Sequence, residues 1–152
     1  MFTRIKYGIE VYGTCSDTLV KKVQVMQNRL LKILFGYNYR HGTNEFHLDL
    51  GFLKVKDVYQ LNVLNFVHDC LSGNIIDSFI QYFQTKSELQ YPNTRNKDNI
   101  TSSKVRTNHG KSTVKFTGAK LWNHFKLNLD IHSSKLILKR HLRAVFLSSY
   151  EC

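Results

Sequence analysis

The chain of 152 residues is long enough for one domain with a sizeable core, or for part of a larger protein. Its composition, 42% hydrophobic and 12% aromatic, argues against a disordered protein. The three cysteines have no CxxC spacing, so neither a disulfide framework nor a zinc knuckle is indicated.

The sequence predicts neither a signal peptide nor a membrane-spanning segment. Its first residues lack a signal-peptide-like apolar run, and no segment approaches the roughly 20 apolar residues of a membrane span. We therefore expect an intracellular protein of the nucleus or cytoplasm, not secreted and with no membrane partner.

The net charge of +11 is distributed unevenly. Residues 1–98 hold 12 basic and 9 acidic side chains, whereas residues 99–150 hold 10 basic side chains and one acidic. No acidic residue occurs between Asp98 and Asp130. The C-terminal third is therefore predicted to bind a polyanion.

The first predicted element is short. Residues 7–13 (YGIEVYG) are typical of the tail of a helix or of an extended lead-in that ends at glycine. Nothing before them could cover Ile5, Tyr7, Ile9 and Val11, so we expect the chain to be truncated at this end.

A long helix is predicted to start at a cap provided by Ser16 or Asp17 and to stop at Gly36. Apolar residues step through it by 4, 3, 4 and 3 positions: Leu19, Val23, Met26, Leu30 and Ile33. We interpret this stripe as core packing and not as a seam for a partner helix, because it lasts too few heptads for a coiled coil.

Further helices are predicted downstream. Residues 37–53 are rich in loops, with a short helical turn near 45–50, and residues 55–71 are apolar on more than half of the circumference, as in a central buried helix. A third helix is expected over 75–83, followed by a polar loop over 84–104. Ser133 or Ser134 caps a last helix, which turns Leu138, Leu142 and Val145 inward.

The acid-free stretch that begins at Lys104 predicts a β-hairpin over residues 104–117. Its Val, Thr and Phe residues favour strand, and residues 108–110 (NHG) are a turn signal. Gly118 interrupts this pattern, and a short helix over 119–125 is predicted to bury Trp122 as a core anchor. The fold class is therefore mainly α, a helical bundle with a small β-hairpin near residues 104–117. Residues 1–84 form the helical body, 85–118 the basic loop and hairpin, and 119–152 the C-terminal helices.

The sequence does not predict an active site. The Gly110-Lys111-Ser112 triplet lacks the earlier glycine of a phosphate-binding loop, since position 105 is valine. The histidines form no metal-binding pair, and no Asp-Asp or Asp-x-Asp gathers carboxylates for metal-dependent chemistry. Cys70 is predicted to be a small core residue. We expect no catalytic residues, metal, cofactor or small-molecule substrate.

Basic side chains are the remaining candidates, and they would bind the RNA or DNA backbone without reading sequence. On the last helix, Lys135, Lys139 and Arg143 repeat at i, i+4 and i+8. The predicted nucleic-acid-binding residues are Arg95, Lys104, Arg106, Lys111, Lys115, Lys120, Lys135, Lys139, Arg140 and Arg143. A single lysine of this kind more often only solubilises a fold, but the absence of acids favours binding by the set as a whole.

An ordered series of motifs resembles the C-terminal region of non-LTR retrotransposon reverse transcriptases of the jockey-like kind. The series opens with residues 7–13 and with the helix from Leu19 to Asn28. It continues with Asn93-Thr94-Arg95 and closes with the helix from Ser134 to Leu142. Between them lie Arg106-Thr107, Gly110-Lys111, Phe116, Gly118-Ala119 and Leu121-Trp122-Asn123, in the family's order and spacing.

The resemblance implies the thumb and post-thumb part of an RNA-directed DNA polymerase, which grips template and primer behind an active site. The fingers, the palm and the catalytic aspartates would lie upstream of Met1, so the chain alone would not be an enzyme. The missing palm and fingers portion is then a possible partner. From the residue types and their pattern, without the resemblance, two alternatives stay open: a free-standing basic nucleic-acid-binding helical module and a structural interaction domain.

Overall fold

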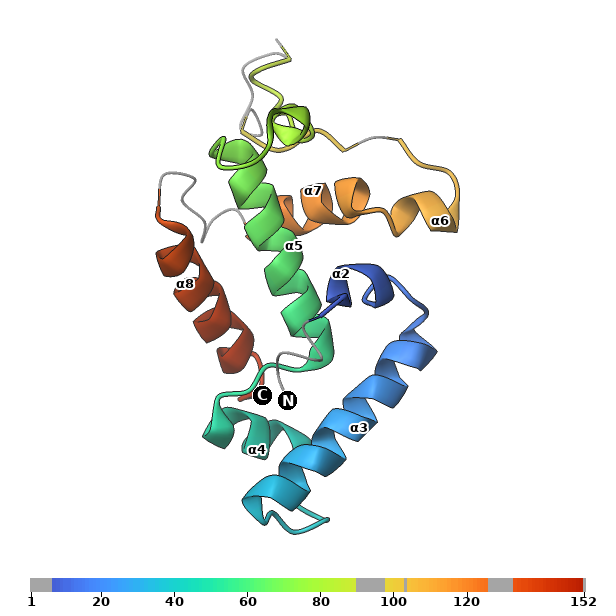
Figure 1. Cartoon of the computed structure of the whole chain (residues 1–152), viewed down its shortest axis with the longest axis vertical. Coiled ribbons are helices and arrows are strands. Elements are labelled where there is room, and N and C mark those ends of the chain that lie inside the picture. The colour runs from blue at the N-terminus through green and yellow to red at the C-terminus, as the bar shows by residue number, and fades with distance from the viewer. Residues whose placement is uncertain (1–6, 90–97, 103, 126–132, 152) are drawn as a thin grey trace. The chain divides into compact units, whose positions relative to one another are not determined.

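The computed structural model describes residues 7–89, 98–102, 104–125 and 133–151 (Figure 1). The fold is mainly α-helical, as predicted. The chain forms two compact units, one made of Met1–Leu61 with Arg140–Cys152 and the other of Asn62–Lys139. Helices α5 (Val55–Leu71) and α8 (Lys135–Ser148) contribute residues to both units.

The first unit contains the helices α2 (Ile9–Tyr12), α3 (Asp17–Phe35) and α4 (Thr43–Leu50). Gly36 ends α3 with a φ of 68°, a left-handed conformation that glycine adopts without a steric penalty, so the predicted stop is confirmed. The start of α5 and the end of α8 complete this unit, in which Phe46, Val55 and Leu142 are fully buried.

Polar groups join the elements of the first unit. Gln27 is buried, and its side-chain amide donates to the carbonyl of Leu53 at 3.0 Å. Arg143 on α8 donates to the carbonyl of Gly51, which ends α4, at 2.6 Å. The Tyr150 hydroxyl accepts from the backbone N–H of Lys54 at 3.0 Å, just before α5 begins.

The second unit contains the rest of α5, a 3₁₀ turn η1 (Asp77–Phe79), the one-turn helix α6 (Asn108–Lys111) and α7 (Val114–Phe125). The aromatic rings of Phe66, Phe79, Tyr82 and Phe83 form an edge-to-face cluster with centroids 5.2 to 6.2 Å apart. Trp122 is 1% exposed, and Cys70 is also buried, so both predicted core positions are confirmed.

The predicted β-hairpin over residues 104–117 is wrong. Residues 108–111 and 114–125 are helical, and the antiparallel bridge that the described chain does contain joins Thr85 to Ile100. Helix α7 starts at Val114, five residues before the predicted short helix. Local strand preference is overridden here because Gly118, Ala119 and Trp122 share one helical face and are all buried.

Two further expectations are also wrong. Residues 75–83 form only the 3₁₀ turn, not a third helix, because their apolar side chains turn in more than one direction: Phe83 is buried, whereas Ile76 is 73% exposed. The apolar stripe of α3 does not pack into the core of its unit. Gln27 and Leu31 are the buried positions of that helix, and most of the stripe faces outward.

Candidate nucleic-acid interface

Residues 104–125, the basic segment, follow a stretch that is firmly anchored in the second unit. Residues 84–86 and 99–101 pair through backbone hydrogen bonds of 2.9 and 3.0 Å. Between them, Ile100 is buried and is held on both sides by Asn123 of α7. The Asn123 amide accepts from the Ile100 N–H at 2.8 Å and donates to its carbonyl at 2.9 Å. Because Asn123 satisfies both backbone groups, α7 has a defined position relative to the start of the segment.

Side chains with hydroxyl groups shape the turn that precedes α7. The Thr107 hydroxyl accepts from the Gly110 N–H at 3.1 Å and caps α6, where the sequence had predicted a hairpin turn. Ser112 donates to the His109 carbonyl and Thr113 to the Gly110 carbonyl, both at 2.7 Å. Helices α6 and α7 contact each other through this turn, which leaves Lys111 exposed.

Helix α7 presents a buried face and a basic face. Gly118, Ala119 and Trp122 are buried, whereas Lys120 and His124 are exposed on the opposite side, one helical turn apart. Lys115 is exposed too, and its ammonium lies 5.2 Å from the centre of the Tyr82 ring. This cation–π contact orients Lys115 without neutralising it.

All five cations of the basic segment are exposed: Lys104, Arg106, Lys111, Lys115 and Lys120. None of them forms an ion pair with another residue that the structure describes. Their charges are therefore left for an external anion, which could approach without breaking an internal salt bridge.

On α8, by contrast, two of the predicted binding cations already have partners within the protein. Lys135 donates to the carboxylate of Asp69 in an ion pair, and Arg143 is committed to the Gly51 carbonyl. Lys139 and Arg140 are exposed. The predicted binding residues of this helix are divided between the two units, because Lys135 and Lys139 belong to the second unit and Arg140 and Arg143 to the first. The predicted binding residue Arg95 lies outside the described residues.

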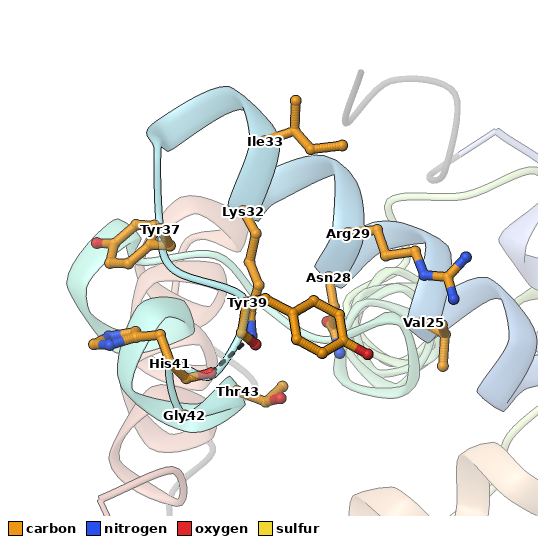
Figure 2. Close-up of a pocket in the computed structure, with 10 residues that line it drawn as sticks. All are labelled: Val25, Asn28, Arg29, Lys32, Ile33, Tyr37, Tyr39, His41, Gly42 and Thr43. Atoms are coloured by element: carbon orange, nitrogen blue, oxygen red, sulfur yellow. Dashed lines mark hydrogen bonds between the residues drawn. The ribbon is translucent and has the colours of Figure 1, made fainter.

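A pocket of about 680 Å³ in the first unit was not predicted from the sequence (Figure 2). Tyr37 and His41 lie at one end of it, and Val25 and Arg29 at the other. The ammonium of Lys32 reaches from α3 to the carbonyls of Tyr39 and His41, at 2.7 Å from each. Lys32 thus fixes the loop after α3, which explains its position without a ligand.

Burial shifts the pKa values of several titratable groups of the first unit, among them His47 and Asp57. Desolvation lowers the pKa of His47, although its Nδ1 hydrogen bond to the Phe52 carbonyl, 2.7 Å long, acts in the opposite direction. Desolvation also raises the pKa of Asp57, which accepts a hydrogen bond from the Tyr150 hydroxyl. These groups hold α4, α5 and the end of α8 together, and none of them lies in the basic segment.

The described residues contain no metal-binding cluster, and the thiol of Cys70 is buried. No group of three or more His, Cys, Asp or Glu side chains in the described chain could hold a metal ion. Burial raises the pKa of the Cys70 thiol to about 11, so it stays protonated at neutral pH. No helix in the part of the chain that the structure describes is both long and apolar enough to cross a membrane.

Comparison of the chain with protein-family models, with curated proteins and with solved structures found no match.

Proposed function

We propose that the chain binds the sugar-phosphate backbone of nucleic acid without reading base sequence. The observation that supports this most directly is the basic segment itself: five exposed cations on one stretch of the second unit, with no carboxylate among residues 99–129. Together with the motif series from Tyr7 to Leu142, it supports the role of a non-catalytic thumb and C-terminal part of an RNA-directed DNA polymerase of the jockey-like kind.

The side chains between the cations favour nucleic acid over an acidic protein as the partner. Thr107 and Asn108 are exposed and can donate hydrogen bonds to phosphate oxygens. Within residues 104–125 no large apolar side chain is exposed. Protein interfaces need buried apolar or aromatic anchors at their centre, and this surface offers none.

Binding can be measured by fluorescence anisotropy with a labelled RNA–DNA hybrid over a series of salt concentrations. Five phosphate contacts predict that log K falls with log salt at a slope of about −4.5, since each contact on a duplex contributes about −0.9. Replacing Lys111 and Lys120 by Ala should reduce the slope by about 2 and weaken binding to all sequences alike. Lys21→Ala removes an exposed cation from α3 and is the control, with no change expected in the slope.

Two results would count against the proposal. One is binding that is insensitive to salt, and the other is an equal loss of affinity in Lys21→Ala and in the double variant. The non-catalytic role is tested separately, by primer extension with the purified chain, Mg²⁺ and deoxynucleotides. We expect no extension, and robust metal-dependent synthesis would contradict that part of the proposal while leaving backbone binding intact.

A further inference from the structure

The apolar stripe of α3 forms an outward-facing seam, made of Leu19, Val23, Met26, Leu30 and Ile33. Met26 is 62% exposed and Ile33 77%, and Leu19 and Leu30 are exposed by 50% and 42%. Gln27 and Leu31, at 1% and 3% exposure, pack into the unit from a different side of α3, roughly 100° around the helix axis from the seam. The seam is thus an exposed apolar face, separate from the side of the helix that packs into the unit, and such faces mark interaction sites.

The spacing of the seam specifies a helical partner. Steps of 4, 3, 4 and 3 place Leu19, Met26 and Ile33 at d positions and Val23 and Leu30 at a positions of two consecutive heptads. Amphipathic helices dock against such a face through anchors at this spacing. A lipid or an extended peptide would require no heptad register.

Charge beside the seam specifies the chemistry of that helix. The g positions of this register are Lys22 and Arg29, both exposed and neither in an ion pair with another described residue. Asp17, at the first turn, is the single acidic residue of α3. The e side is partly occupied by the unit itself, since Gln27 is buried there. The free flank is therefore basic, and carboxylates on a partner helix would complement it.

A second copy of this chain complements the seam poorly. In an antiparallel pair of α3 helices, g positions face g positions, which places Lys22 opposite Arg29 of the other copy and costs energy through like-charge repulsion. In a parallel pair, g faces e, which places Lys22 opposite the buried Gln27. Neither arrangement provides a carboxylate.

We infer that α3 is a docking site for an amphipathic helix of another protein, with a two-heptad apolar seam and acidic residues along one flank. This helix lies over Leu19, Met26 and Ile33, and its carboxylates face Lys22 and Arg29. The site belongs to the first unit and is independent of the basic segment, so it does not rest on the proposed nucleic-acid binding.

The test uses the full chain and two synthetic 21-residue helical peptides, a length of about three heptads. Both have Leu at a and d; one has Glu at e and g and the other Lys. Calorimetry should show binding of the Glu peptide alone. Met26→Glu should weaken it by about tenfold or more, as expected when a charge replaces an apolar anchor. Lys22→Glu with Arg29→Glu should reverse the preference, so that the Lys peptide binds. Lys21→Glu makes the same charge change away from the seam and should leave affinity unchanged.

The variants change exposed side chains, and unaltered circular dichroism and thermal unfolding confirm that each one is folded. No binding of the Glu peptide, or equal binding of both peptides, overturns the inference. So does either of two other uses of the seam: binding to phosphatidylserine-containing vesicles, or self-association in sedimentation equilibrium, if Met26→Glu abolishes it.

Discussion

Gly118 fixes how closely α7 approaches the core of the second unit, so the basic face on the other side of α7 depends on it. A Cβ atom at this position would lie 2.9 Å from both Phe83 Cζ and Val67 Cγ2. Both neighbours are buried and cannot turn into solvent. Gly118→Val is therefore expected to force the helix or its neighbours to move.

The cost of Gly118→Val follows from two opposing effects. Replacing glycine in a helix interior stabilises the helix by a few tenths of a kcal/mol for valine, because the unfolded chain loses freedom. Overpacking a filled core costs about 1–3 kcal/mol, and the valine adds two further methyl groups beyond the clashing Cβ. We therefore expect the free energy of unfolding to fall by about 1–3 kcal/mol.

Urea denaturation followed by Trp122 fluorescence measures this change directly. Lys120→Val, two residues along α7 and exposed, is the matched control and should shift stability by no more than about 0.5 kcal/mol. Phe83→Leu should recover part of the loss when combined with Gly118→Val, because it removes the atom that clashes. If Gly118→Val leaves the midpoint unchanged, α7 does not pack against α5 at this point, and the reasoning fails.

Three further substitutions have defined outcomes. Tyr150→Phe removes a buried hydroxyl that joins the Lys54 N–H to the Asp57 carboxylate, and should lower the free energy of unfolding by about 1–3 kcal/mol in urea titrations. The pKa of His47 in the folded chain lies below its ordinary value of 6.5. As the pH falls below 6.5, the unfolded chain therefore binds a proton at His47 before the folded chain does. Stability should fall between about pH 7 and pH 5, by at most about 1.4 kcal/mol per pH unit, and His47→Gln should flatten this part of the pH profile. Asp69→Asn breaks an ion pair whose lysine is 56% exposed, and a thermal melt should show a loss of at most about 1 kcal/mol.

The sequence was sufficient to predict the long helices. The start of α3 at Ser16, one of the two predicted caps, its end at Gly36 and the full range of α5 agree with the prediction, because capping residues and apolar periodicity are local signals. The burial of Leu138 and Leu142 on α8 was predicted for the same reason.

The errors arose where tertiary contacts override local preference. Val114 and Phe116 favour strand, yet they lie in α7 because Gly118, Ala119 and Trp122 can then pack together against the core. The seam of α3 has the spacing of a core stripe, yet the unit covers the side that carries Gln27 and Leu31. The pattern of a single helix cannot say which of its sides the rest of the unit covers. The pocket beside Lys32 depends on the path of the following loop, which no local pattern encodes.

The candidate interface was predictable in part. The absence of acids over residues 99–129 is a property of the sequence, and the five cations of the basic segment are exposed as their prediction required. The roles of Lys135 and Arg143 were not predictable, because their partners Asp69 and Gly51 are distant in the sequence. Helical spacing alone placed them in one stripe with Lys139.

Lysine footprinting tests the binding role of the basic segment most directly. The chain is acylated with and without a saturating RNA–DNA hybrid, and the reactivity of each lysine is read by mass spectrometry. Bound duplex should protect Lys104, Lys111, Lys115 and Lys120, whereas Lys21 and Lys56, exposed on the first unit, should react equally in both samples. Equal protection of all these lysines, or protection of Lys21 and Lys56 alone, would contradict a phosphate-binding surface on the basic segment.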